Sequence, residues 1–183
     1  PINMKGRFPH PPLKPISNPL PKNGTSMNSE APSALLDATL AFRSGLIKKL
    51  ETVPENKWDL IPQGHHNNIR WQCAHLCVTP GLLTYVRLDE PFPFSRPASS
   101  RKGTNPSSFD QAEDYGNKIL LGLMKEVILR LQKDAPELSL LPFEPYETST
   151  GLVLKDLSGA FAYSSVHDGI HIGTVSSMLR QMG

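Results

Sequence analysis

Two histidines near the end of the chain, His167 and His171, are four residues apart within the stretch SSVHDGIHIGTVSSMLRQM. On an α-helix, residues at this spacing lie about 40° apart around the axis and one turn apart along it. Both imidazoles can therefore reach one point. Neutral imidazole nitrogens are ligands of zinc and related divalent metals, so the pair is a candidate part of a metal site. Histidines at this spacing also occur on ordinary solvated helix faces, and the pair alone leaves that alternative open.

A third histidine belongs to an earlier segment with helical periodicity. The inward stripe of this segment consists of Trp71, His75, Val78, Leu82 and Tyr85. In a small bundle, His75 can meet the pair of the last helix, which gives three neutral nitrogen ligands and an open fourth position, as in a catalytic zinc-type site. A single histidine on an apolar face is more often a hydrogen-bonded core residue, so this alternative also stays open.

The strip of the last helix that carries the histidine pair has little other side-chain volume, because its remaining members are Ala160, Ser164 and Thr174. Small side chains at these positions predict a cavity beside the imidazoles. Trp71 and Tyr85 are candidate walls of this cavity, although aromatic residues at helical spacing are also ordinary core residues.

The two cysteines, Cys73 and Cys77, each lie two residues from His75 and therefore about 200° away from it around the helix. We expect them to be buried, reduced thiols and not metal ligands. They enclose no long loop that a disulfide would close, which agrees with a reducing compartment.

Four helices must position these residues. Apolar residues recur at intervals of three and four in residues 33–53, 68–85, 107–131 and 156–182, and Asn68 is a candidate cap of the second helix. Strand-like alternation is not sustained anywhere. The predicted fold class is therefore all-α, a four-helix bundle with long loops.

A proline-rich arm, residues 1–30, is expected to precede the bundle domain, residues 31–183. Seven of the 18 prolines fall within residues 1–26, which show no hydrophobic period and so predict no core of their own. The arm is either an added leader before a natural start at Met27 or a natural tail that packs on the domain or on a second subunit.

The composition argues against several classes of partner. The formal net charge is +2, and the scattered lysines and arginines form no footprint for nucleic acid or a membrane surface. No apolar run approaches the roughly 18 residues of a membrane span, and no signal-peptide region is visible. We expect a cytoplasmic protein that acts on a small-molecule substrate.

The segments NNIRWQCAHL and HDGIHIGTVSSMLR resemble the DinB/YfiT-like superfamily, and the resemblance runs from about residue 33 to the end of the chain. It implies a four-helix bundle with one metal-binding histidine in the second helix and an H-x-x-x-H pair in the fourth. Carried over by position, His75, His167 and His171 become the ligands. The resemblance also implies a divalent metal, most often nickel or zinc, and frequently a homodimer.

The resemblance does not define one reaction. Characterised members of the superfamily include transferases and isomerases that use low-molecular-weight thiols such as bacillithiol, mycothiol or glutathione, and many others are labelled only as metal-dependent hydrolases. A metal with three neutral ligands can lower the pKa of a bound water or of a bound thiol. A thiol needs no separate base, whereas hydrolysis usually also uses a carboxylate.

The residue after His167 is Asp168, which points about 100° away from it, so no carboxylate is well placed as a base. Asp168 is a candidate acceptor for a ring N–H of a ligand, or a surface or helix-contact residue. We therefore expect a metal-dependent enzyme and favour a thiol-dependent S-transferase over a hydrolase. The alternative is a non-catalytic metal- or ligand-binding module, in which a further protein ligand would close the fourth position.

Overall fold

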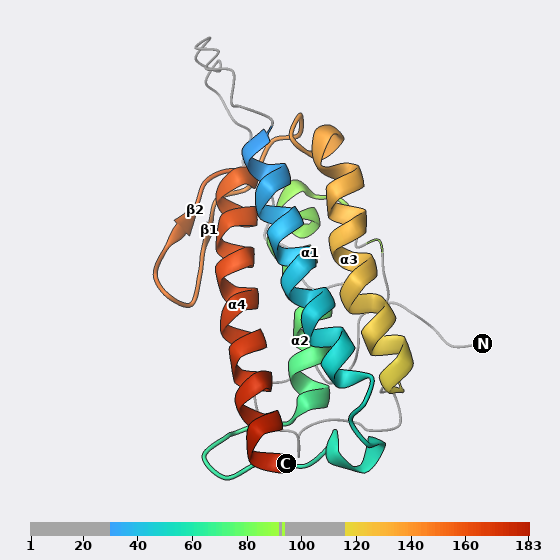
Figure 1. Ribbon diagram of the computed structural model, residues 1–183. Coiled ribbons are helices and arrows are strands. Elements are labelled where there is room, and N and C mark those ends of the chain that lie inside the picture. Colours follow the sequence, from blue (N-terminus) through green and yellow to red (C-terminus); the bar gives the residue numbers. More distant parts are fainter. Residues whose placement is uncertain (1–29, 92, 94–115) are drawn as a thin grey trace, which may run out of the picture.

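The computed structural model describes residues 30–91, 93 and 116–183, which form one helical bundle (Figure 1). Its long helices are α1 (Glu30–Leu50), α2 (Ile69–Leu83), α3 (Asn117–Leu138) and α4 (Leu157–Met182). The predicted all-α four-helix fold is therefore confirmed. Among the helices described here, none is long and apolar enough to cross a membrane.

The order of the helices around the bundle differs from their order in the chain. α1 packs against α3 and α4, and α2 packs against the same two helices, so α1 and α2 lie diagonally opposite each other. In Figure 1, α1 and α4 run downward and α2 and α3 run upward. α2 and α4 are thus antiparallel neighbours, and their contact brings together residues that are far apart in the sequence.

Side-chain caps define the starts of both helices that carry the histidines. Asn68 Oδ1 accepts a hydrogen bond from the backbone N–H of Trp71 at 2.8 Å, which confirms the predicted cap of α2. Asp156 Oδ1 accepts from the N–H of Gly159 at 2.7 Å at the start of α4. Each cap pairs one of the N–H groups that the first turn of a helix leaves free.

Several boundaries differ from the sequence-based prediction. α2 ends at Leu83, and a short 3₁₀-helix, η2 (Tyr85–Leu88), follows it. α3 continues to Leu138, beyond the predicted end at residue 131, whereas its predicted start at Ser107 lies outside the described residues.

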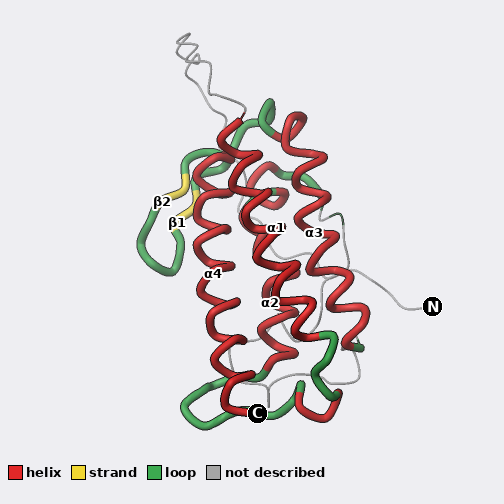
Figure 2. Tube along the Cα trace, viewed as in Figure 1, coloured by secondary structure: helices red, strands yellow, loops and turns green. Residues whose placement is uncertain are grey.

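Two further short elements were expected to be loop. One is the 3₁₀-helix η1 (Glu55–Lys57), and the other is an antiparallel hairpin of β1 (Tyr146–Glu147) and β2 (Val153–Leu154) (Figure 2). Strands of two residues show no detectable alternation, which explains why the sequence did not predict them.

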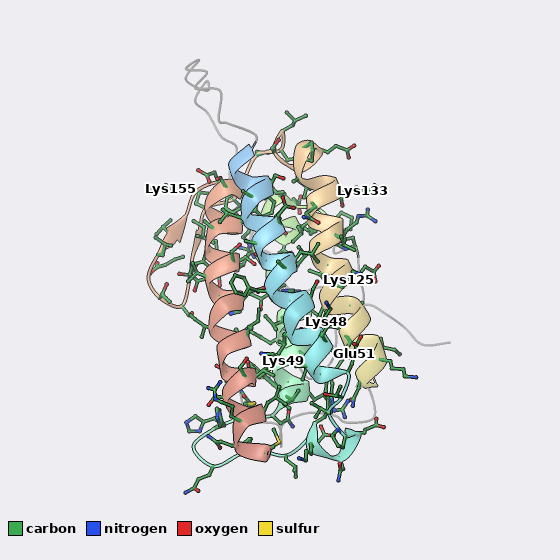
Figure 3. The ribbon with its side chains drawn as sticks, viewed as in Figure 1. Lys48, Lys49, Glu51, Lys125, Lys133 and Lys155 are labelled. Carbon is green, nitrogen blue, oxygen red and sulfur yellow. The ribbon has the colours of Figure 1, made fainter. Side chains whose placement is uncertain are left out.

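A polar layer separates two apolar clusters in the core. One cluster includes Leu46, Ile69, Leu120, Val175 and Met178, and the other includes Leu36, Tyr85, Leu131, Leu157 and Phe161. By position along α1 and α4, Arg43 and Asp168 lie between these clusters, and both side chains are buried. Other charged residues, such as Lys125 and Lys133, lie on the outside of the bundle (Figure 3).

Candidate metal centre

Three imidazole nitrogens from two helices converge on one point. His75 Nε2 on α2 lies 3.2 Å from His167 Nε2 on α4, and His171 Nε2 lies 3.0 Å from the same atom. Two imidazole nitrogens bound to one tetrahedral zinc-type ion are about 3.3 Å apart. The spacing therefore fits a single ion. Among the described residues, the group contains no cysteine and no carboxylate.

Burial keeps the three imidazoles neutral. Burial, together with the neighbouring His171 and His167, lowers the pKa of His75 to about 3. Burial and the positive charge of Arg43 lower the pKa of His167 to about 4. The pKa of His171 is lowered to about 4, mainly by burial and also by His167. At neutral pH each ring therefore has a nitrogen lone pair available, which is the form that binds a metal.

Neighbouring side chains hold two of the rings in place. Gln72 Oε1 accepts a hydrogen bond from His171 Nδ1 at 2.5 Å, and Gln72 Nε2 donates to Asn67 Oδ1 at 2.7 Å. With its proton on Nδ1, His171 presents an unprotonated Nε2 to the other histidines. Trp71 stacks on His75, with ring centroids 4.6 Å apart and an angle of 13° between the planes, as expected for a wall of the site.

As far as the described residues show, one side of the centre faces solvent. α2 is buried on nearly every side, but His75 and Thr79 are half-buried, and Leu82, which was expected to face inward, is exposed. The three residues follow one another at spacings of four and three. They form one strip of the helix. Thr79 Oγ1 lies 3.2 Å from His75 Nε2, which places a hydroxyl beside the donor atoms. This arrangement suits an exchangeable fourth ligand.

Asp168 is a helix-contact residue. Its Oδ2 accepts a hydrogen bond from Arg43 Nε at 2.6 Å, and both side chains are buried. Of the alternatives that the sequence leaves open for Asp168, the structure therefore supports the contact between helices. Its carboxylate oxygens are not among the atoms that converge with the three histidine nitrogens.

Two expectations about the surroundings of the histidines need correction. Tyr85 is not a wall of the site, because its hydroxyl donates to Asp134 Oδ2 at 2.8 Å and its ring packs in the Leu36 cluster. The small residue Ala160 does not line an open cavity, because it is fully buried against Leu83 and Leu154. Neighbouring apolar side chains fill the space that a small residue leaves.

Both cysteines are free thiols and fully buried, as predicted. Burial raises the pKa of Cys73, and it raises the pKa of Cys77 to about 12. Cys77 Sγ donates to the carbonyl of Leu120 at 3.7 Å, on the side of α2 that packs against α3. The expectation that the thiols point away from His75 agrees with this contact.

Sequence reasoning did not find Arg43 or Gln72. Arg43 has a detectable signal, because it lies at three- and four-residue spacing with buried residues of α1 such as Thr39 and Leu46. An arginine on such a stripe is seldom buried without partners. Gln72 has no comparable signal, since its role depends on an imidazole from another helix.

Comparison with known proteins identifies the family. A model of the DinB superfamily matches residues 38–175, and the chain belongs to this superfamily. The solved structure of YfiT from Bacillus subtilis has a TM-score of 0.60 and 18% sequence identity, and the match covers 88% of this chain and 93% of that chain. YfiT is described as a probable metal-dependent hydrolase with an unusual four-helix bundle topology. At this identity the likeness concerns the fold. No curated protein matches the sequence.

Proposed function

We propose that the protein is a metal-dependent enzyme and that His75, His167 and His171 hold one divalent ion. The observation that carries the proposal is the convergence of three neutral Nε2 atoms at 3.0–3.2 Å beside a solvent-facing strip. A set of imidazole nitrogens suits zinc and nickel, the two metals that the sequence resemblance implies. The homodimer implied by the same resemblance stays a prediction.

The protein's own residues prepare the site for an exchangeable ligand. Gln72 orients His171, and Trp71 covers one face of His75. When bound, a divalent metal supplies Lewis acidity and lowers the pKa of a water or thiol at its open position. The hydroxyl of Thr79 lies beside His75 Nε2 and can hydrogen-bond a small molecule there.

Transfer of a small thiol to an electrophile is the reaction class that we favour. No carboxylate in the described part of the chain joins the three histidines, and Arg43 engages Asp168. Among the described residues, no carboxylate is placed to assist a bound water, whereas a thiol needs no such assistance. Hydrolysis is the second candidate, and the description of YfiT supports it. Water can also lose its proton at a three-histidine zinc site without a carboxylate.

The experiment compares both reactions on one preparation. The protein is stripped of metal, reloaded with Zn²⁺ or Ni²⁺, and assayed with bacillithiol, mycothiol or glutathione and a chlorobimane electrophile. A second assay follows hydrolysis of p-nitrophenyl acetate without thiol. We expect thiol transfer that rises with added metal, saturates at one ion per chain, and is absent from the His171→Ala variant.

The other outcomes are also decisive. Metal-dependent ester hydrolysis without thiol transfer would replace the first candidate by the second. A fully loaded protein without turnover in either assay would favour the non-catalytic binding module. A protein that binds neither metal would remove the proposal.

A further inference from the structure

One side chain of α1 is bonded to all three other helices. Arg43 is 0% exposed, and its Nε donates to Asp168 Oδ2 on α4 at 2.6 Å. Its Nη1 donates to the carbonyl of Met124 on α3 at 2.8 Å, and its Nη2 donates to the carbonyl of Leu76 on α2 at 2.6 Å. The guanidinium is rigid and planar, so these three bonds place their acceptors at defined positions relative to one another.

The carbonyl of Leu76 is available because of a proline. In an uninterrupted α-helix it would accept from the N–H of the residue four positions later, and that residue is Pro80, which has no N–H. A buried carbonyl without a partner costs free energy. Arg43 supplies the missing donor. Pro80 on α2 and Arg43 on α1 are therefore complementary parts of one arrangement.

The acceptors on α2 and α4 are adjacent in sequence to proposed ligands. Leu76 follows His75, and Asp168 follows His167. Arg43 therefore spans the two helices at the level where the imidazoles meet. The apolar clusters lie on either side of this level, and apolar contacts allow sliding that directed hydrogen bonds do not.

We propose that Arg43 is a positioning residue of the metal centre, which acts through Asp168 and the Leu76 carbonyl to set α4 against α2. This inference rests on the proposed function, because it concerns the same three histidines. A buried ion pair is often replaceable by apolar residues without loss of stability, so the contribution of the ion pair to stability does not by itself account for Arg43. A metal site requires donor atoms within a few tenths of an ångström of their places, and a fixed register between the helices provides this.

The main test is the double variant Arg43→Met with Asp168→Leu, which removes both charges and keeps the site filled. Circular dichroism reports the fold, chelator competition gives the Zn²⁺ dissociation constant, and the visible spectrum of the Co²⁺ form reports coordination geometry. We expect a folded protein, Zn²⁺ binding weakened about tenfold or more, and a changed Co²⁺ band. A folded variant with wild-type affinity and spectrum would overturn the inference.

A second variant covers the case in which the double variant does not fold. Arg43→Lys keeps the charge but cannot reach three acceptors at once, so weaker Zn²⁺ binding and a changed Co²⁺ band are again expected. Unchanged values in this variant would overturn the inference.

The matched control is Tyr85→Phe, which removes the part-buried hydrogen bond from Tyr85 of the Leu36 cluster to Asp134 and should leave affinity and spectrum unchanged. An equal loss of affinity in Tyr85→Phe would show a general effect of stability and would also overturn the inference. Wild-type protein that binds neither Zn²⁺ nor Co²⁺ would instead refute the proposed function.

Discussion

Gln72 and His171 form a hydrogen bond of 2.5 Å, from His171 Nδ1 to Gln72 Oε1, between the second and fourth helices. This bond determines which nitrogen of His171 carries the proton and leaves Nε2 directed at His167. Gln72 is itself held by Asn67. The orientation of one proposed ligand thus depends on a chain of two amide side chains.

Replacing Gln72 by leucine should weaken Zn²⁺ binding by about 10–100-fold, because the ring of His171 loses the acceptor that fixes its tautomer. The dissociation constant is measured by chelator competition. The matched control is Gln132→Leu, which removes a glutamine that bonds Asp37 on the surface, and we expect no change there. Equal affinity in wild type and Gln72→Leu would show that the bond does not support the metal.

The metal-free protein should lose stability as the pH falls from about 6.5 toward about 4. Unfolded histidines bind protons with a pKa near 6.5, whereas the folded pKa of His75 is about 3 and that of His167 about 4. The unfolded state therefore binds more protons in this window, so the free energy of unfolding falls with falling pH. Above pH 6.5 the histidines are neutral in both states, and their contribution to the free energy of unfolding is fully present.

Urea unfolding of the metal-free protein at several pH values measures this dependence. Carboxylates also titrate at low pH, so the comparison is with His75→Gln, which lacks one titrating group. Between pH 6.5 and 4, the free energy of unfolding of this variant should change less steeply with pH than that of wild type. Identical slopes would contradict the lowered pKa of His75.

The thiols of Cys73 and Cys77 should react with a disulfide reagent about 100-fold more slowly in the native protein than in urea, because both are buried and burial raises their pKa values. The release of coloured thiolate follows the reaction, and metal analysis follows the ion. Rapid modification that releases metal from folded protein would place a cysteine among the ligands.

Periodicity and helical phase predicted the parts of the protein that depend on local sequence. The spacing of apolar residues predicts four helices and places His75 on the inward face of the second, whose start Asn68 caps. The H-x-x-x-H spacing places His167 and His171 on one face. The convergence of the three nitrogens follows from these two phases once α2 and α4 are neighbours.

The parts that depend on contacts between distant residues were not predictable in this way. Burial of Arg43 depends on acceptors from three other helices, including a carbonyl that Pro80 leaves free. The strip around Ala160 suggests a cavity from its small residues, but Leu83 and Leu154 fill the space. Neither the partners of a charge nor the filling of a gap can be inferred from one helix alone.

The proposed metal centre holds one divalent ion between His75, His167 and His171. The most direct measurement is the metal content of untagged wild-type protein and of His171→Ala after equilibrium dialysis against Zn²⁺, with circular dichroism on both. We predict one ion per wild-type chain, and little metal on a variant that keeps its helices, because buried apolar residues such as Phe161 and Val175 hold α4 in the bundle. Full Zn²⁺ occupancy with wild-type affinity in a folded His171→Ala variant would show that His171 is not a ligand and that the three histidines do not form the metal centre.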